Sequence, residues 1–499
     1  MVTNDENENK DIARRAVSGS AYSVASSAVT IVLGVVRSIL LARFLLPEHF
    51  GVVALALVFL NFSAQIRSFG LDNALIQRRE SHDELFATYF TLRQGTVLLT
   101  LGILALLVPV IGRFYPDYAL LVPLLYSFIV IDLFKSFNTV QTTILNKQMA
   151  FKLIAIVDII SSIGMTIVAP TLAYLGFGVW SLVAERVTSH LVRIVAIWIL
   201  YRPWRPRIGW NSQIARELWQ FGIKLWMAGN LNYLLDSFDD FWTATILGKI
   251  PAGYYDRAYE FSNYPRRVIA NPLTPVFFAT FAQLQNDRVR LSRAFFRAIS
   301  LMIRTGFWFS LVFIAIAPEG IELFLEAKWL PMVTTFQLMI LYTLFDPLMA
   351  TLNRLLIAVG QAGLILQTKV FQFIIFVPSV ILLAELNGIE GVAIAADIMI
   401  MVGIFFLFHH TGKFVDYSRY TLWGWPVVAL LLSAGGGLML TAVWQSLPLW
   451  GSLLGKGFFI SSIYWGVLLL MERDELNRGW QMVWGLMSPR LRKRLGKAA

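Results

Sequence analysis

Long apolar segments alternate with short polar connections along the whole chain. Each segment is close to the ~20 residues with which a helix crosses the hydrocarbon core of a bilayer. A membrane β-barrel would instead show stretches of about ten residues of alternating polarity. We therefore predict an all-α polytopic membrane protein with about fourteen transmembrane helices. The predicted spans are residues 20–46, 49–71, 86–110, 119–139, 153–174, 178–200, 222–247, 258–281, 294–317, 332–357, 363–384, 390–410, 424–445 and 452–471.

The amino-acid composition supports this interpretation. Hydrophobic residues make up 57% and charged residues 15% of the 499 residues, and the mean hydropathy is +0.64. A soluble domain is about half apolar and about a quarter charged. The chain has no cysteine, which excludes disulfides, thiol catalysis and iron–sulfur ligation. The five histidines have no spacing that is typical of a metal site, so we predict no metal ligands.

Lysine and arginine are concentrated in every second connection, and this asymmetry sets the orientation of a membrane protein. The basic connections contain Arg78, Arg79, Lys147, Lys152, Arg202, Arg205, Arg207, Arg216, Arg288, Arg290, Arg293, Arg297, Lys369, Lys413 and Arg419. The alternate connections contain only Arg113, Lys249, Lys328 and Lys456. Both ends of the chain are basic like the first set, so we predict that both termini are cytoplasmic. These positions account for the net charge of +11, and we expect no nucleic-acid partner.

A weak internal repeat relates the two halves of the chain. The first span ends in LARFLLPEHFGVVALA and the seventh ends in TATILGKIPAGYYDRA. In both, a long helix is followed by a proline and then a glycine, Gly51 in the first case and Gly253 in the second. Transporters are often built from such repeats, with the substrate path at the repeat interface. The repeat predicts two pseudo-symmetric six-helix lobes, followed by two additional C-terminal helices.

This organisation divides the chain into six predicted regions. They are a cytoplasmic N-terminal tail (1–19), an N-lobe of helices 1 to 6 (20–201), a basic cytoplasmic linker (202–221), a C-lobe of helices 7 to 12 (222–411), helices 13 and 14 (412–471) and a basic C-terminal tail (472–499). The C-terminal tail has two tryptophans at helical spacing and a basic end. We predict that it forms an amphipathic helix at the surface of an anionic membrane.

Arginines within or beside the apolar spans need a physical explanation. The first helix carries a continuous polar face that includes Arg37, and Arg67 lies near the end of the second helix. An arginine at the centre of a bilayer costs from ~2.5–3.5 to ~10–17 kcal/mol, depending on the method of estimation. We expect a hydrated cationic cavity for the set Arg37, Arg67, Arg257, Arg266 and Arg267. For any single arginine, snorkelling to the interface or structural ion pairing is the alternative.

Acidic residues in the spans form a second candidate group. Asp236, Asp239 and Asp240 lie together near the end of the seventh span. They could pair with Arg37 as a gate, or they could carry a coupling cation. Further candidates for buried charges are Asp132 with Lys135, Asp158, Glu185 with Arg186, Arg304, Asp346 with Arg354, and Asp397. The aromatic residues Trp226, Tyr233, Tyr254 and Tyr255 could stack on sugar rings, although interfacial anchoring or core packing explains each of them individually.

Missing motifs narrow the classes of function. The chain has no G-x-x-x-x-G-K-[ST] motif, so we predict no nucleotide-driven pump. No long loop is present to carry the residues of a membrane glycosyltransferase or polymerase. We therefore predict a non-enzyme without catalytic residues or a bound cofactor. Coupling to a proton or sodium gradient is left open.

The run SILLARFLLPEHFGVVALALVFLNFSAQIRSFGLDNALIQRR resembles the opening of Wzx-type polysaccharide flippases, in particular their colanic-acid-exporter-like branch. In that branch the first helix ends in L-A-R-x-L-x-P-x-x-F-G, and the second ends in F-x-x-x-G-L-x-x-A-L-I-Q-R. The residues that fit are Arg43, Pro47, Phe50, Gly51, Gly70, Leu71, Ala74, Leu75, Ile76, Gln77 and Arg78. The later stretches MAFK, GVWSLV and YYDRA also fit, and the similarity becomes thinner after about residue 330.

The resemblance implies membership of the multidrug/oligosaccharidyl-lipid/polysaccharide exporter superfamily. It implies a flippase that moves undecaprenyl-pyrophosphate-linked oligosaccharides from the cytoplasmic to the periplasmic leaflet of the bacterial inner membrane, for exopolysaccharide, capsule or O-antigen assembly. Alternating access to a central cationic cavity is the implied mechanism. The implied partners are membrane lipids and, in addition, a polysaccharide polymerase and export machinery. The alternatives are a cation-coupled antiporter of drugs or other small molecules and a membrane enzyme that acts on polyprenyl lipids.

Overall fold

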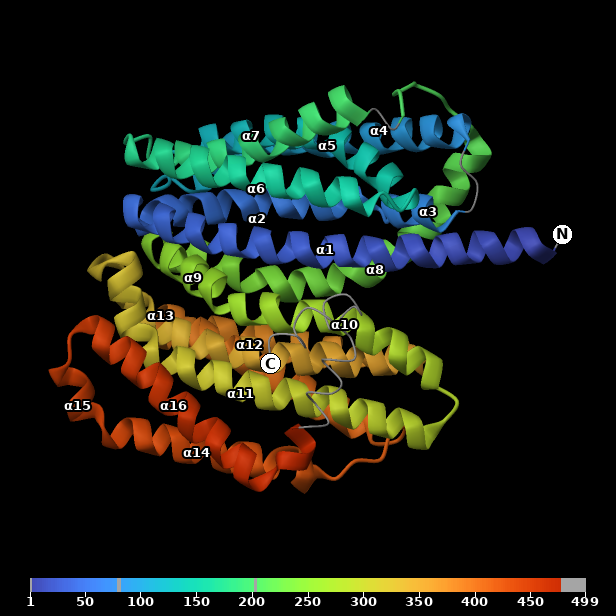
Figure 1. Cartoon of the computed structure of the whole chain (residues 1–499). Coiled ribbons are helices and arrows are strands. Elements are labelled where there is room, and N and C mark those ends of the chain that lie inside the picture. The colour runs from blue at the N-terminus through green and yellow to red at the C-terminus, as the bar shows by residue number, and fades with distance from the viewer. Residues whose placement is uncertain (1, 79–81, 202–203, 477–499) are drawn as a thin grey trace. The chain divides into compact units, whose positions relative to one another are not determined.

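The computed structural model describes residues 2–78, 82–201 and 204–476, and these residues form helices and connections without a β-strand (Figure 1). In the first half, the helices are α1 (Val2–Phe44), α2 (Pro47–Ser68), α3 (Leu71–Gln77), α4 (Asp83–Phe114), α5 (Leu121–Lys147), α6 (Phe151–Tyr174), α7 (Trp180–Ile194), α8 (Ser212–Trp242) and α9 (Lys249–Ser262). Two π-helical segments extend α7 and α8, namely η1 (Val195–Tyr201) and η2 (Thr243–Leu247).

In the second half, the helices are α10 (Tyr264–Leu284), α11 (Arg288–Leu325), α12 (Val333–Ala358), α13 (Ala362–Thr411), α14 (Arg419–Met439), α15 (Thr441–Ser446) and α16 (Leu449–Met471), with a short 3₁₀ segment, η3, at Ala327–Met332. Ten of the described helices are long and apolar enough to cross a membrane. The prediction of an all-α polytopic membrane protein is confirmed.

Each of the fourteen predicted spans corresponds to helical residues, but the eighth was placed wrongly. The span predicted at 258–281 is divided by Asn263 into the end of α9 and most of α10. Pro265 lies in the first turn of α10, where proline is tolerated because the missing N–H would be unbonded anyway. Pro272 and Pro275 lie inside α10 without ending it. Neighbouring groups in a membrane protein can satisfy the carbonyls that such prolines release.

The eleventh and twelfth predicted spans lie within the single element α13. Gly388 has φ 57° and ψ −136°, so the helix axis breaks at this residue. A methyl group on Gly391 would overlap the backbone carbonyl of Leu383, which shows how closely the chain turns back here. The break separates the two predicted segments, 363–384 and 390–410, as the glycine-containing connection between them suggests.

The two ends of the chain compare differently with their predictions. Residues 1–19 were predicted as a cytoplasmic tail, and in the structure they are helical, since α1 begins at Val2. Acidic and basic residues of this kind are compatible with a helix, and no proline precedes the apolar part. The predicted amphipathic helix in region 472–499 falls almost entirely on residues 477–499, which lie outside the described residues.

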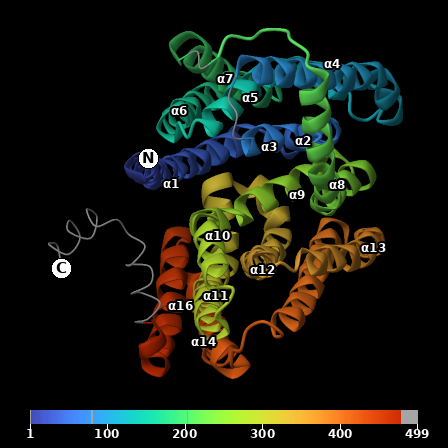
Figure 2. The ribbon, with the colours of Figure 1, turned by 90° about the vertical axis from the view of Figure 1, so that its right-hand side faces the viewer.

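The contacts divide the chain into two compact units, Met1–Arg257 and Ala258–Ala499. The lobe boundaries predicted from the repeat remain a prediction. In the first unit, α1 packs against α6, α6 against α7, and α4 against α5 (Figures 1 and 2). In the second unit, α11 packs against α12, α14 and α16. Two ion pairs join α11 to the C-terminal region, between Arg304 and Glu472 at 2.7 Å and between Lys456 and Glu319 at 2.5 Å.

Helix α8 belongs to the first unit because it is fastened to α2 along its length. The indole N–H of Trp226 donates to the carbonyl of Gln65 at 2.7 Å, and the hydroxyl of Tyr233 donates to the carbonyl of Val58 at 3.4 Å. Near the start of α8, Gly222 meets Gly70, the residue between α2 and α3. A methyl group on either glycine would overlap the backbone of the other segment.

This contact gives a stability prediction. Replacing Gly222 by alanine should destabilise the protein by about 1–3 kcal/mol, because overpacked backbone contacts can relax only by separating α8 from α2. Thermal unfolding in detergent measures the change. Gly95→Ala is the matched control, since Gly95 lies inside α4 with open space around its Cα. That control should gain about 0.5–1 kcal/mol from helix propensity. Equal stabilities of the two variants would contradict the close backbone contact.

Candidate functional site

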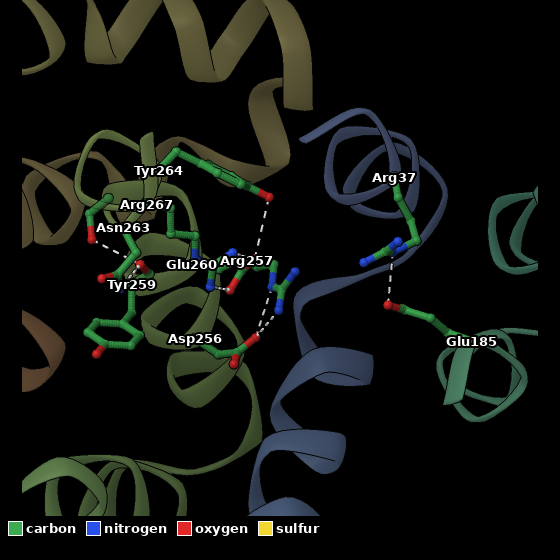
Figure 3. A network of polar contacts seen from close by, with 10 residues as sticks. Arg37, Glu185, Asp256, Arg257, Tyr259, Glu260, Asn263, Tyr264 and Arg267 are labelled. Carbon is green, nitrogen blue, oxygen red and sulfur yellow. Dashed lines mark hydrogen bonds and ion pairs between the residues drawn. The ribbon is translucent and has the colours of Figure 1, made fainter. Parts of the chain in front are cut away.

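The first unit brings five charged side chains from three helices together. Arg37 of α1 forms an ion pair with Glu185 of α7, with 2.9 Å between Nε and Oε1. Both side chains are largely but not completely buried, with 16% and 23% of their surface exposed. Figure 3 shows the Arg37 guanidinium turned toward the Glu185 carboxylate. The Arg37 Nη1 atom is buried and has no hydrogen-bond partner among the described residues, so one further donor remains for an anion.

Arg186 adds a second guanidinium to this group. It lies next to Glu185 in α7 and within electrostatic range of Asp256 in α9. Its guanidinium stands 5.5 Å from the centre of the Phe128 ring, a geometry typical of a cation–π contact. The sequence analysis named Arg186 only as a candidate buried charge beside Glu185, and the structure also places it within electrostatic range of α9.

Arg257 supplies the third guanidinium. Its Nε and Nη2 atoms donate to the same carboxylate oxygen of Asp256, at 2.8 and 2.6 Å. Its Cζ atom lies 4.4 Å from the centre of the buried Phe50 ring in α2. We call Arg37, Glu185, Arg186, Asp256 and Arg257 the charged cluster. Its three guanidinium groups face two carboxylates, so the positive charges are in excess by one.

The three predicted gate or coupling acids lie close to this cluster but do not pair with Arg37. Arg37 contacts Glu185 instead, because α7 rather than α8 presents a carboxylate to it. Asp239 accepts a hydrogen bond from the Tyr255 hydroxyl at 2.6 Å. Asp240 is within electrostatic range of Asp236, Asp239 and Asp256. The acids on α8 and the acid on α9 therefore form one electrostatic group.

Arg67 occupies a more enclosed place than the sequence suggested. Only 5% of its surface is exposed, and it forms a buried ion pair with Asp132 of α5. Its backbone carbonyl accepts a hydrogen bond from Arg93 at 2.9 Å, and Arg93 in turn approaches Asp72 at 3.4 Å. For this residue the geometry fits the alternative of structural ion pairing.

Arg93 was missed by the sequence analysis. Its signal was available, since it interrupts the apolar third span in the segment TLRQG. Lys135 contacts Asp132 at 3.4 Å and lies within electrostatic range of Arg67 and Arg93. We call Arg67, Arg93, Asp132 and Lys135 the inner group. The side chain of Lys135 is 46% exposed, so it is the accessible cation of the inner group.

The remaining candidates, Arg266 and Arg267, lie in the second unit. Arg266 pairs with Asp346 of α12 at 2.8 Å, so the expected pairing of Asp346 with Arg354 is wrong. Arg354 stands instead over the ring of Phe278. Arg267 makes a bidentate contact with Glu260, at 2.9 and 3.0 Å (Figure 3). With 32% and 39% of their side chains exposed, Arg266 and Arg267 are more accessible than the candidates Arg37, Arg67 and Arg257.

Arg266 also lines a small, partly open pocket between α10, α11 and α12. Its wall is mostly apolar, with residues such as Met302, Phe309 and Leu344, and it also includes Thr305 and Thr343. This combination of one cation, threonines and apolar side chains is compatible with an amphipathic ligand.

The aromatic candidates mostly serve the fold. Trp226 and Tyr233 hold α8 against α2 through their polar atoms. Tyr255 is buried with 2% exposure and donates to Asp239. These three contacts agree with the interpretation as packing residues rather than as a platform for sugar rings.

Comparisons with known proteins agree with this architecture. The family model described as "Polysaccharide biosynthesis protein" matches residues 40–334. The lipopolysaccharide biosynthesis protein WzxC of Escherichia coli strain K12 is 25% identical over 392 residues, which cover 76% of this chain and 77% of that protein. The succinoglycan biosynthesis transport protein ExoT of Rhizobium meliloti strain 1021 is 31% identical over 277 residues, or 55% of each protein.

Solved structures support the same fold. The lipid II flippase MurJ, in an inward closed conformation, aligns with a TM-score of 0.67 at 15% identity, covering 92% of this chain and all of that one. An inward-facing multidrug resistance transporter of the MATE family, in the MOP superfamily, aligns with a TM-score of 0.55 at 14% identity, covering 79% of this chain and 95% of that one. The names of ExoT, MurJ and the MATE protein describe transport or flipping, which fits the expected non-enzyme, whereas WzxC is named for lipopolysaccharide biosynthesis.

Proposed function

The chain belongs to the family of polysaccharide biosynthesis proteins, and from this premise we propose that it is a flippase for undecaprenyl-pyrophosphate-linked oligosaccharide units. It moves them from the cytoplasmic to the periplasmic leaflet of the bacterial inner membrane, with both of its termini in the cytoplasm. The two related proteins WzxC and ExoT are named for lipopolysaccharide biosynthesis and for succinoglycan biosynthesis transport, which supports this class of substrate.

The charged cluster is the observation that supports the proposal most directly. Three guanidinium groups from α1, α7 and α9 lie in a unit built of membrane-spanning helices. A pyrophosphate is a compact anion with several oxygens, and guanidinium groups bind such oxygens with paired hydrogen bonds. Glu185 and Asp256 accept from these donors in the empty protein, so the pyrophosphate competes with them for the guanidinium groups.

This exchange suits a transporter better than permanently free arginines would. When the pyrophosphate leaves, the carboxylates return to Arg37 and Arg257, so these two guanidinium groups are paired again. An unpaired buried charge would cost several kcal/mol, and the paired arrangement avoids that cost in the empty protein. Arg266 and Arg267 are paired with carboxylates in the same way in the second unit.

We propose that the acids on α8 connect transport to an ion gradient. Asp236, Asp239 and Asp240 lie within electrostatic range of one another, and Asp256 extends this group to α9. Neighbouring carboxylates repel one another in a poorly solvated region, so the group favours the uptake of a proton or a sodium ion. Asp240→Asn should then weaken the dependence of transport on the imposed gradient.

Reconstitution tests the proposed function. The purified chain is inserted into liposomes that contain an undecaprenyl-pyrophosphate-linked oligosaccharide, and an impermeant sugar-binding probe reports its exposure on the opposite leaflet. We expect faster exposure than in protein-free liposomes. The absence of exposure with folded protein, under an imposed proton gradient and under an imposed sodium gradient, would contradict the proposal. Efflux of cationic drugs by the same liposomes would favour the alternative of a cation-coupled antiporter.

A further inference from the structure

The turns that mark the internal repeat contact each other directly. One is Pro47–Gly51 at the start of α2, and the other is Lys249–Gly253 at the start of α9. We call them the paired turns. A methyl group on Gly51 would overlap the carbonyl group of Lys249, and a methyl group on Gly253 would overlap the carbonyl group of Pro47. The contact is therefore reciprocal, and it requires glycine on both sides.

An ion pair supports this backbone contact. Lys249 Nζ lies 3.2 Å from Glu48 Oε2, and both side chains are more than a third exposed. Just before the second turn, α8 ends in the π-helical segment η2, and Gly248 follows with φ 95°. π-Helical segments frequently occur at functional sites, and a residue with positive φ restricts this position to glycine or a few others.

The residues of α9 that contact the start of α2 lie on one face of the helix. Lys249, Gly253 and Arg257 are spaced by four residues, so they lie above one another on the helix. Lys249 contacts Glu48, and Gly253 contacts the Pro47 carbonyl. Arg257 stands over the ring of Phe50, the residue next to Gly51. The anion-binding candidate Arg257 is thus the third contact in the same row.

We propose that Arg257 couples anion binding to the opening of the paired turns. This inference rests on the proposed function. In the empty protein, Arg257 holds α9 to α2 through Phe50 and keeps the paired turns together. A bound pyrophosphate draws the guanidinium away from Phe50 and Asp256. The row then retains the exposed pair of Lys249 and Glu48 and the backbone contact of Gly253 with Pro47, and without the third contact the paired turns separate.

By the predicted orientation, the paired turns lie at the periplasmic end of the helices. Their separation would therefore open the site on the side to which the oligosaccharide is delivered. The contact between Gly70 and Gly222, at the opposite end of α2, does not involve Arg257. Anion binding at Arg257 should therefore leave the contact between Gly70 and Gly222 unchanged, and this contact serves as an internal reference.

Cross-linking measures the separation, because the natural chain has no cysteine to interfere. In nanodiscs, the double variant Glu48→Cys with Lys249→Cys reports on the paired turns. The double variant Arg78→Cys with Glu217→Cys replaces an ion pair between the end of α3 and α8 and serves as the reference. The rate of disulfide formation is followed with undecaprenyl pyrophosphate, with uncharged undecaprenol, and without either lipid.

We expect undecaprenyl pyrophosphate to slow cross-linking of the paired turns about 3- to 10-fold, the change that corresponds to losing one cation–π contact. Undecaprenol should have no effect, and the reference pair should cross-link at an unchanged rate. In the Phe50→Leu background, cross-linking should already be slow without lipid, and the lipid should change it little. Gly51→Ala should slow it as well, since its methyl group separates the turns.

Binding of undecaprenyl pyrophosphate is measured in the same nanodiscs. This measurement distinguishes a failure of the coupling through Arg257 from a failure of the proposed flippase function. Binding with an unchanged cross-linking rate would overturn the coupling and leave the flippase standing. An equal change in the Phe50→Leu background would also overturn the coupling, because the effect would not pass through Arg257 and Phe50. A failure to bind the lipid at all would overturn the proposed function, and this inference with it.

Discussion

Replacing Arg37 or Arg257 by glutamine is expected to weaken the binding of undecaprenyl pyrophosphate about 10- to 100-fold and to slow transport by a similar factor. Each guanidinium offers paired, charge-assisted hydrogen bonds to the anion, and a hydrogen bond to a charged group contributes ~1.5–3 kcal/mol. Glutamine keeps a polar side chain of similar length but removes the charge. The measurements are lipid binding in nanodiscs and sugar exposure in liposomes.

The ion pairs of the empty protein make an additional variant necessary. Removing Arg37 leaves Glu185 without its ion-pair partner, which by itself could lower the stability of the protein. The double variant Arg37→Gln with Glu185→Gln removes both charges and should recover stability without recovering transport. Arg113→Gln, at an exposed position at the end of α4, is the control and should behave like the natural protein. Full transport by the Arg37 and Arg257 variants would exclude the charged cluster as the anion site.

Replacing Arg67 by alanine should lower the free energy of unfolding by about 3–5 kcal/mol. The substitution leaves Asp132 as a buried carboxylate that has lost its arginine partner. Lys135 contacts the same carboxylate at 3.4 Å but is half exposed, so it replaces the lost charge only in part. Thermal unfolding in detergent measures this loss. The expected result differs from that for Arg37, for which the double variant regains stability but not transport.

The double variant Arg67→Met with Asp132→Leu distinguishes two roles of Arg67, a structural ion pair and a ligand of the phosphate. Apolar side chains of similar size can replace a buried ion pair with little loss of stability. We expect this variant to fold and to transport within about threefold of the natural protein, an expectation that follows from the low exposure of both side chains. Normal stability together with abolished transport would instead make Arg67 a ligand of the phosphate.

The first unit also changes how the repeat is understood. In the sequence, the two halves are related by the similarity of two turns, one around Gly51 and one around Gly253. The structure shows that these turns pack against each other, with each glycine on the backbone of the other turn. A contact between equivalent segments of two repeats is self-complementary, so one sequence pattern can serve both sides. The glycines are needed because the backbones approach too closely for any side chain.

The sequence by itself determined the class of fold and the approximate position of most of the long apolar helices. These follow from local physics, since ~20 consecutive apolar residues satisfy their backbone groups only as a helix within a bilayer. It also determined that the arginines in the spans needed partners or water. The resemblance of residues 38–79 indicated the family, which the family model over residues 40–334 now supports.

Only the tertiary structure decided which carboxylate faces which arginine. Arg37 pairs with Glu185 rather than with the acids of α8, Arg266 pairs with Asp346, and Arg67 is enclosed with Asp132. Hydrophobic periodicity fixes the face of a helix on which a residue lies, but not the neighbouring helix that this face meets. Partners on separate helices are selected by the packing of the whole unit, and one rotation of a helix exchanges them. For this reason the candidates were visible in the sequence, and their roles were not.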